Sequence, residues 1–299
     1  MQMAKKYKAP LGASLVVLSS VFYASYGVWT KLMGNFFDGY TASAYRSLLV
    51  LLFLLPIAFV GRSLQPLRLK QNWRYIAGLV IASLLVWGPI YYAILHAGIG
   101  ISTTINYASI VIGQFFFGWL FAGERFTRDK AISAGLGFVG LIIIFSPSIQ
   151  TIGWLALSAA AISGLCIGAN TVFAKKIHYN ATQSTIVLWI SSVVANFFMA
   201  FVLHRPAPDF GWHIEWLYLV LFAIASLVAS WSMVSGVKLI DAGAAGVLGL
   251  LEVVFGVLFG VIFFHERPGI VVLAGVIVIL AAAAIPYVKD YNVRRGTLE

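Results

Sequence analysis

Charged residues are scarce in this sequence, and cysteine is nearly absent. Only 10% of the 299 residues are charged and 61% are hydrophobic, whereas soluble domains carry roughly 25% charged residues. Such a chain has too little polar surface to cover a water-facing globule, which excludes an ordinary soluble protein. The single Cys166 excludes an intrachain disulfide and a thiolate metal cluster. The composition therefore indicates an integral membrane protein.

The motifs of membrane enzymes and ATPases are also missing. No GxxxxGK phosphate loop is present, so we expect no ATP hydrolysis by this chain. None of the five histidines forms an HExxH pair, and all of them lie at the ends of apolar segments or between them. We therefore predict no catalytic residue, no metal site and no cofactor.

Ten apolar segments have the length of about 17–25 residues that a membrane-spanning helix needs. They are 11–31, 40–60, 75–95, 101–122, 130–146, 152–173, 182–203, 215–237, 242–264 and 269–288. The first segment lacks a small-residue cleavage site, so we interpret it as a retained span rather than a signal peptide. The sequence thus predicts an all-α polytopic membrane protein with ten transmembrane helices. The last four residues, 296–299, resemble a vector-derived remnant.

The basic residues predict the orientation of the chain. With the N-terminus in the cytoplasm, the lysines and arginines fall in cytoplasmic segments except Lys31, Arg205, Arg267 and the intramembrane Arg46. This asymmetry follows the positive-inside rule and places both termini in the cytoplasm. Since orientation accounts for the net charge of +10, we expect no nucleic-acid partner, which would need a clustered basic face.

One phrase occurs twice, as FGWLFAGERF at 117–126 and FGVIFFHERP at 259–268. Five predicted spans separate the two copies, so the second crosses the membrane in the opposite direction. With an offset of 144, Ser19, Tyr26 and Lys31 fall on Ser163, Asn170 and Lys175. We infer an inverted duplication, with one five-helix repeat over 11–147 and the other over 152–288. Such halves can expose a central site to each side of a membrane in turn.

These features resemble the drug/metabolite transporter superfamily, EamA family. The resemblance covers residues 11–288 and is carried by the repeat and by three short motifs, Tyr91-Tyr92-Ala93, Gly123-Glu124-Arg125 and His265-Glu266-Arg267. Within the family the chain resembles the bacterial aromatic amino-acid exporter branch. The resemblance implies a multi-pass protein of the bacterial inner membrane that exports a small molecule. In that family a Glu-Pro pair often precedes the loop glutamate; here Glu252 occupies the glutamate position and Val253 replaces the proline.

Glu252 lies about ten residues into its span, near the middle of the bilayer, where a carboxylate costs about 2.5 kcal/mol or more. It either binds an ammonium group or couples protons, or it is a scaffold carboxyl that holds neighbouring helices together. Arg46 lies about six residues into its span, about 9 Å deep at 1.5 Å per residue. We expect its side chain to reach the outer interface or to pair with Asp38; contact with an anionic substrate is the alternative.

Polar and aromatic side chains recur at helical spacing in the apolar spans. Because polar atoms in lipid must find partners, such faces turn inward and can line a cavity. The candidate substrate-binding residues are Ser19, Tyr23, Tyr26, Trp87, Tyr91, Tyr92, Asn106, Tyr107, Ser163, Asn170, Ser230 and Trp231. The alternative for each is helix packing or an interfacial aromatic belt. For Glu124-Arg125 and Glu266-Arg267 we expect capping and local ion pairing, with gating as the alternative.

The sequence therefore predicts a secondary transporter. Aromatic faces with few charges favour a zwitterion or a neutral ring compound over a phosphorylated one, and the resemblance favours amino acids with aromatic or neutral side chains. Export of drugs, nucleobases or other metabolites, or flipping of a lipid-linked sugar, are the alternatives. The expected partners are the solute and membrane lipid. We expect a monomer, because the glycines of span 242–264 serve packing within one chain.

Overall fold

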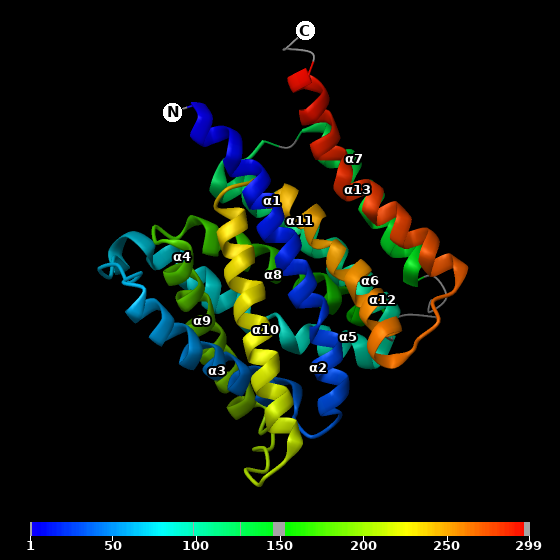
Figure 1. Cartoon of the computed structure of the whole chain (residues 1–299). Helices are drawn as coiled ribbons and strands as arrows, with labels where there is room; N and C mark the ends of the chain where they lie inside the picture. Colours follow the sequence, from blue (N-terminus) through cyan, green and yellow to red (C-terminus); the bar gives the residue numbers. More distant parts are fainter. Residues whose placement is uncertain (1, 98, 126, 146–152, 296–299) are drawn as a thin grey trace.

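The protein folds into helices throughout the residues that the structure describes. The computed structural model describes residues 2–97, 99–125, 127–145 and 153–295, and no strand occurs in these ranges. The predicted all-α class is thereby confirmed, whereas the remnant predicted at 296–299 lies outside the described residues. The helices are α1 (Gln2–Ala24), α2 (Tyr26–Met33), α3 (Gly39–Val60), α4 (Leu69–Leu84), α5 (Trp87–Ala97), α6 (Ile99–Ala122), α7 (Arg128–Phe145), α8 (Trp154–Lys176), α9 (Ala181–Val202), α10 (Ile214–Val237), α11 (Ala242–Gly249), α12 (Leu251–Phe264) and α13 (Ile270–Arg295) (Figure 1).

Within the described ranges, eight segments are long and apolar enough to cross a membrane. They are Lys8–Met33, Gly39–Val60, Leu69–Ile94, Ile101–Ala122, Trp154–Lys176, Ala181–Val202, Ile214–Val237 and Ala242–Phe264. The predicted span 130–146 corresponds to α7, which begins with three charged residues, and the predicted span 269–288 corresponds to α13, in which Ile270–Ile285 are apolar. The chain is a polytopic membrane protein, and the number of ten transmembrane helices stays a prediction.

Three of the eight segments are interrupted, although the sequence predicted each of them as one continuous helix. Lys8–Met33 breaks at Ser25, between α1 and α2. Leu69–Ile94 breaks between Leu84 and Trp87, and Ala242–Phe264 breaks at Leu250, between α11 and α12. At the second break Pro89 has no N–H, so the backbone bond that would continue the helix across this point cannot form. Periodicity did not reveal these breaks, because the apolar pattern runs through them.

A break inside a membrane leaves backbone groups that need new partners. The Ser163 hydroxyl of α8 donates to the Val86 carbonyl oxygen at 2.8 Å, at the break between α4 and α5. The Ser20 hydroxyl of α1 lies 3.4 Å from the Leu248 carbonyl oxygen, two residues before the break between α11 and α12. In both cases the partner comes from the other half of the chain, so the breaks depend on tertiary packing.

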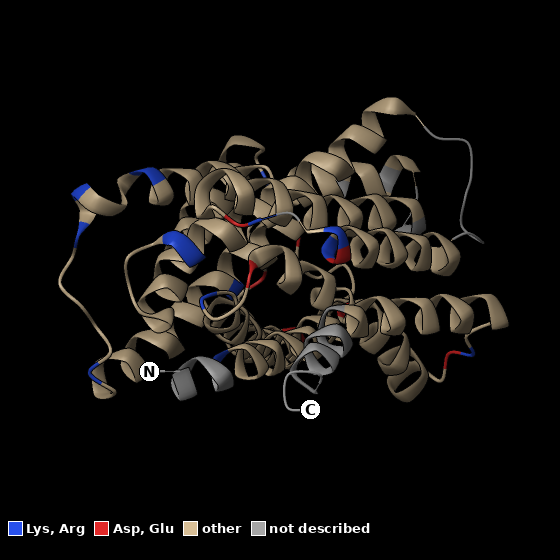
Figure 2. Ribbon diagram, turned by 90° about the horizontal axis from the view of Figure 1, so that it is seen from above, with Lys and Arg blue, Asp and Glu red and all other residues tan. Residues whose placement is uncertain are grey.

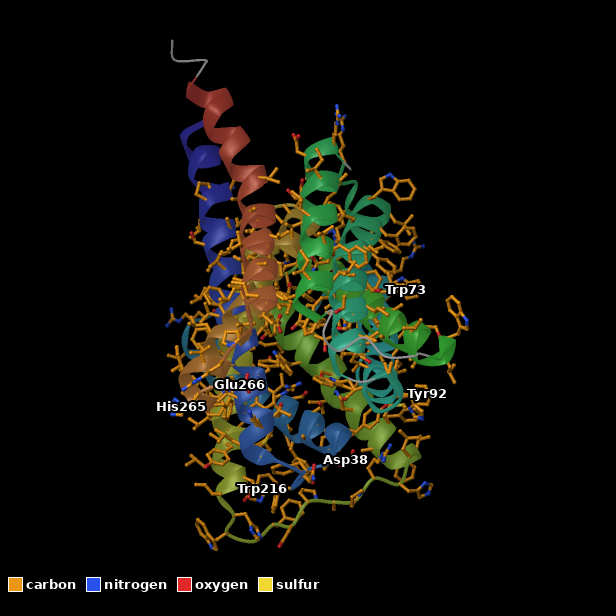
Figure 3. All side chains as sticks on the ribbon, turned by 90° about the vertical axis from the view of Figure 1, so that its right-hand side faces the viewer. Asp38, Trp73, Tyr92, Trp216, His265 and Glu266 are labelled. Carbon is orange, nitrogen blue, oxygen red and sulfur yellow. The ribbon has the colours of Figure 1, made fainter. Side chains whose placement is uncertain are left out.

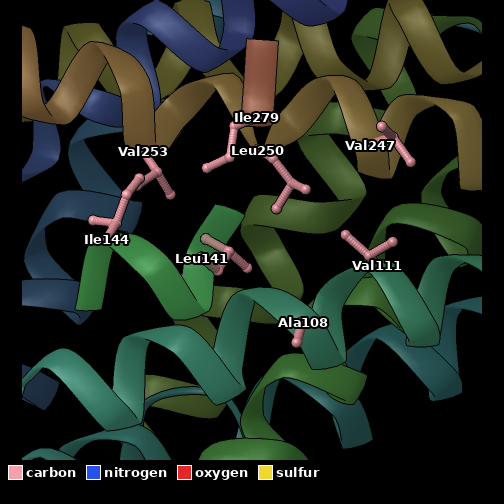
Figure 4. Packing of buried hydrophobic residues seen from close by; sticks show 8 residues of the cluster. All are labelled: Ala108, Val111, Leu141, Ile144, Val247, Leu250, Val253 and Ile279. Atoms are coloured by element: carbon pink, nitrogen blue, oxygen red, sulfur yellow. The ribbon is translucent and has the colours of Figure 1, made fainter. Parts of the chain in front are cut away.

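Helices α7 and α13 pack against each other at the edge of the bundle. A Cβ added at Gly140 would lie 3.0 Å from the Gly275 carbonyl oxygen, and one added at Gly275 would lie 2.8 Å from the Gly140 carbonyl oxygen. The crossing therefore needs glycine on both helices, as close helix packing in membranes generally does. Leu141 and Ile279 of this pair belong to a buried cluster that extends to α6, α11 and α12 (Figure 4).

The start of α1 and the end of α13 lie at the same end of the bundle (Figure 1). We call this the terminal end; the positive-inside rule predicts that it faces the cytoplasm. Seen from above, most lysines and arginines lie on turns and helix ends, and the long helices are nearly free of charge (Figure 2). The segment Ala242–Phe264 begins at the terminal end and runs to the opposite end (Figure 1).

Candidate functional site

A cavity of about 320 Å³ lies among the broken helices. Its lining residues come from α1 to α6 and from α8 to α12, and among the described residues none comes from α7 or α13. Each break contributes to the lining: Tyr26 begins α2, Trp87 begins α5, and Glu252 lies in the first turn of α12. The volume is at the lower end of the roughly 300–1,000 Å³ that ligand pockets occupy. The cavity is therefore large enough for a small organic molecule.

Most of the candidate residues are brought together in this cavity. Those that line it are Tyr23, Tyr26, Trp87, Asn106, Tyr107, Asn170, Ser230 and Glu252. They come from α1, α2, α5, α6, α8, α10 and α12, so residues far apart in the sequence share one site. That these residues bind a substrate stays a proposal.

Four candidates lie elsewhere. Ser19 is fully buried outside the lining, and Ser163 bonds the Val86 carbonyl oxygen behind the cavity wall. Tyr92 lies at the edge of the bundle and stacks on His96 with ring centroids 4.0 Å apart (Figure 3). Trp231 is 38% exposed, and its indole N–H donates to the Thr182 hydroxyl.

The side chain of the remaining candidate, Tyr91, lies outside the description. Trp231 follows Ser230 directly, and neighbours on an α-helix point about 100° apart, so one faces the cavity while the other faces away.

Arg46 is placed differently from the expectation. Its side chain neither reaches the interface nor pairs with Asp38, whose carboxylate lies 3.8 Å from Arg205 instead. Arg46 is 3% exposed and lines the cavity. The expectation was wrong because depth along a span says nothing about rotation: α3 turns Arg46 inward, where four aromatic rings surround it. The guanidinium carbon lies 4.4 Å from the ring centre of Phe222, 5.0 Å from Tyr26, 5.1 Å from Trp87 and 5.8 Å from Trp189.

Glu252 is held by a residue of the first half of the chain. The Tyr107 hydroxyl of α6 donates to Glu252 Oε1 at 2.8 Å. Because Glu252 lies in the first turn of α12, the dipole of that helix favours its negative charge. The break at Leu250 thus creates a helix N-terminus at the cavity and places a carboxylate beside it, and it does so without the proline that the family resemblance would supply.

Several lining residues were not anticipated from the sequence. The Trp189 indole N–H of α9 donates to the Ser230 hydroxyl at 2.8 Å, which fixes its ring at the cavity wall. Ser192 and Asn196, also on α9, line the cavity and are bonded to each other at 3.0 Å. A signal was available, since these two polar residues are four apart within an apolar run and must therefore share one helical face.

The repeated phrase has a local structural role at both ends of the bundle. Gly123 and His265 have left-handed φ angles of 66° and 53°, which end α6 and α12. The N–H of Glu124 then bonds the Gly118 carbonyl oxygen at 3.1 Å, and the N–H of Glu266 bonds that of Gly260 at 3.1 Å. In both copies the chain turns back so that the glutamate side chain lies over the glycine.

Each of these glutamates pairs with a lysine of the other half of the chain. Lys175 lies 2.6 Å from Glu124, and Lys31 lies 3.0 Å from Glu266. The side chains of the first pair are 17% and 9% exposed, whereas those of the second are 55% and 57% exposed.

The Glu124 carboxylate also accepts from the N–H of Ala242, at 2.8 Å, where α11 begins. Ala242 begins the segment Ala242–Phe264, and Glu266 lies just beyond its other end. The two ion pairs therefore lie at opposite ends of the bundle. The Glu124 pair is at the terminal end and the Glu266 pair is at the far end.

The sequence matches the EamA-like transporter family twice, over residues 10–146 and 154–287. The chain belongs to the EamA-like transporter family. These ranges lie close to the predicted halves 11–147 and 152–288, and the division into inverted five-helix repeats stays a prediction. As a member of this family the chain is a multi-pass membrane transporter.

Two relatives and one solved structure to which this EamA protein is similar share 26% identity or less with it. A riboflavin transporter of Rhizobium johnstonii is 26% identical over 288 residues, which is 92% of this chain and 90% of the relative. An uncharacterized transporter of Helicobacter pylori is 21% identical over 258 residues, 83% of this chain and 85% of the relative. A solved crystal structure with 17% identity covers 94% of this chain and 98% of its own, with a TM-score of 0.78. At that identity the likeness supports the fold alone.

Proposed function

We propose that this EamA protein is a secondary transporter that exports amino acids with aromatic or neutral side chains across the bacterial inner membrane. It works by alternating access, in which the central cavity opens to the two sides of the membrane in turn. The observation that carries the proposal is the cavity itself. It is formed by helices of both halves, while an ion pair between the halves lies at each end of the bundle.

Alternating access requires two halves that can exchange conformations. The family matches the chain twice, and corresponding glutamates, Glu124 and Glu266, lie at opposite ends of the bundle. Both features support an inverted pair of five-helix repeats. In such a pair, a contact that closes one end of the bundle in the first state has an equivalent in the other repeat. That equivalent contact closes the opposite end in the second state.

The two ends differ in this structure. At the terminal end, Lys175 and Glu124 are largely buried, and both also bond the turn between α10 and α11: Lys175 donates to the Ile240 carbonyl oxygen at 2.7 Å, and Glu124 accepts from Ala242. At the far end, Lys31 and Glu266 are more than half exposed. These contacts support a state that is sealed at the terminal end, and the reciprocal state would bury the Lys31–Glu266 pair instead.

The lining supports a small solute with an apolar ring and a few polar groups. Tyr23, Tyr26, Trp87 and Trp189 offer ring faces or edges for stacking. Amides from Asn106, Gln114, Asn170 and Asn196 offer hydrogen bonds without charge. An aromatic amino acid fits this chemistry and the volume.

Riboflavin is the second candidate, because the Rhizobium johnstonii relative is named a riboflavin transporter. A flat ring system could also stack on the aromatic lining. It carries neither a carboxylate nor an ammonium group, however, so it would leave the charged residues of the cavity unused.

The test is uptake of radiolabelled phenylalanine into proteoliposomes that contain the purified protein, with unlabelled phenylalanine or riboflavin as competitor. We expect uptake that saturates and that excess phenylalanine suppresses. Empty liposomes control for diffusion, and Tyr92→Phe, which changes a ring outside the cavity, is the matched variant. In a parallel assay with radiolabelled riboflavin, protein-dependent uptake of riboflavin without uptake of phenylalanine would replace amino acids by the second candidate. No protein-dependent uptake of either solute would contradict the proposed function.

A further inference from the structure

The cavity contains a buried cation that has no anionic partner. Arg46 is 3% exposed, and among the described residues no carboxylate lies within ion-pair distance of its guanidinium. Its Nε atom is fully buried and has no hydrogen-bond partner. A buried charge left without a partner is costly. Intramembrane charges are therefore usually retained because they bind something.

The rings around Arg46 hold its charge without neutralising it. Aromatic rings interact with the flat face of a guanidinium group, and four ring centres lie 4.4 to 5.8 Å from its central carbon. The N–H donors of arginine lie in the plane of the group, in a fork that matches a carboxylate. The rings therefore hold Arg46 at the cavity wall without supplying an anion for its N–H donors.

The cavity also contains a carboxylate that has no cationic partner. Glu252 lines the cavity, and Tyr107 bonds only its Oε1 atom. Among the described residues no lysine, arginine or histidine lies within 4.0 Å of this carboxylate. Its second oxygen is thus free to accept a hydrogen bond from a ligand.

The two charges do not pair with each other, although they line the same cavity. Tyr23 and Tyr26 lie close enough to interact electrostatically with both. A ligand in this cavity can therefore meet a cation, a carboxylate and the two tyrosine rings. A pure anion would satisfy only Arg46, and a pure cation would satisfy only Glu252.

We propose that Arg46 and Glu252 form a two-point site for a zwitterion, in which Arg46 binds the carboxylate of the ligand and Glu252 binds its ammonium group. Tyr23, Tyr26 and Trp87 contact the remainder of the ligand, which carries the carboxylate and the ammonium group. This inference rests on the proposed function and deepens it, because it says which chemical feature of the solute the carrier recognises. It also assigns Arg46 a direct role in recognition.

The test uses three compounds that share a phenyl ring and differ in charge. Phenylalanine carries both groups, 3-phenylpropionate carries only the carboxylate, and phenethylamine carries only the ammonium group. Binding to the purified full-length protein in detergent is measured by displacement of radiolabelled phenylalanine and by calorimetry for the analogues. We expect phenylalanine to bind at least about tenfold more tightly than either analogue, because a missing charge leaves a buried partner unpaired.

Two variants make the assignment specific. Arg46→Gln should lose the preference for phenylalanine over phenethylamine, and Glu252→Gln should lose the preference for phenylalanine over 3-phenylpropionate. Each variant retains affinity for the analogue that does not use the altered residue, which shows that it is folded. Arg205→Gln, which removes an arginine outside the cavity, should keep the wild-type order.

Unchanged preferences in both variants, or equal affinity of the wild type for all three compounds, would overturn the two-point site. The proposed carrier function fails separately. If the proteoliposomes transport riboflavin while phenylalanine does not bind, the zwitterion site is wrong and the protein is still a carrier. If phenylalanine binds with the expected preferences but no solute crosses the membrane, the site stands and the transport proposal fails.

Discussion

The Glu124 carboxylate lies 2.6 Å from the Lys175 ammonium group, which belongs to the other half of the chain. The equivalent residues, Glu266 and Lys31, form the same contact at the opposite end of the bundle. The phrase that occurs twice in the sequence therefore forms an ion pair with the other half of the chain at each end of the bundle. Its glycine makes room for the glutamate side chain, and its glutamate pairs with a lysine across the boundary between the halves.

The two ion pairs should contribute unequally to stability. Glu124→Gln leaves Lys175 largely buried without its anion, and breaking a buried pair costs about 3 kcal/mol or more. Glu266→Gln breaks an exposed pair, which is worth about 0–1 kcal/mol. Thermal unfolding of the detergent-solubilised protein should show a much larger loss for Glu124→Gln. Equal losses would mean that the terminal end is not the sealed one.

Gly118 of the repeated phrase should be required for stability, because the Glu124 side chain lies close to where a Cβ would be. A Cβ at Gly118 would lie 2.8 Å from Glu124 Oε2, so Gly118→Ala must displace the carboxylate from the start of α11. We expect a loss of about 1 kcal/mol, the usual cost of losing a helix cap, in the same unfolding assay. Gly256→Ala is the matched control, since nothing lies within 4 Å of its added Cβ. The idea fails if both alanine variants unfold at the wild-type temperature.

Stability should rise with pH because of Lys238, which lies just beyond α10. Burial, with the nearby charge of Lys175 as a second cause, lowers the pKa of Lys238 from 10.5 to about 8. Above about pH 8 the folded protein loses this proton while the unfolded chain keeps it up to about pH 10.5. Since stability rises with pH wherever the unfolded state binds more protons, Lys238 adds stability between these values.

The measurement for Lys238 is thermal unfolding at pH 7.5 and at pH 9.5. Lys238→Met and Lys238→Arg should both lose this part of the pH dependence, because methionine carries no charge and arginine stays charged. Met should unfold at a higher temperature than Arg at either pH. If both variants keep the wild-type difference between the two pH values, the titrating group is another one.

Tyr107 should support ligand binding through Glu252. Tyr107→Phe keeps the ring and removes only the hydroxyl that donates to Glu252 at 2.8 Å. We expect phenylalanine to bind about threefold to tenfold more weakly, the effect of one net hydrogen bond. Tyr92→Phe makes the same chemical change outside the cavity and should leave binding unchanged. Equal affinity of the two variants for phenylalanine would show that Tyr107 does not support ligand binding through Glu252.

The sequence predicted the helical class and ten spans, because the apolar runs are long and separated by turns. Eight of these spans correspond to segments of the described residues that are long and apolar enough to cross a membrane. The sequence located Tyr107 and Glu252 because polar groups in such runs must face protein. It could not predict the partner of Glu252, since the contact joins residues 145 positions apart. It missed the break at Leu250, because the freed carbonyl oxygens are bonded by hydroxyls from distant helices.

Arg46 shows the same limit for a single side chain. Hydropathy gives the depth of a residue in its span, but the direction of the side chain depends on how the helix is rotated. That rotation is set by the rings that pack around the guanidinium, from α2, α5, α9 and α10. Ser230 and Trp231 were predicted together for the same reason, and packing separates them.

The most direct test of the central claim is two-sided access to the cavity. Thr171 lines it, and a Thr171→Cys protein that also carries Cys166→Ala offers one thiol for a membrane-impermeant reagent applied to either side of sealed, uniformly oriented vesicles. We predict that the thiol reacts mainly from the far end in the wild type, and that Glu124→Gln raises the rate from the terminal end while Glu266→Gln does not. Reaction from only one side in every variant would contradict alternating access.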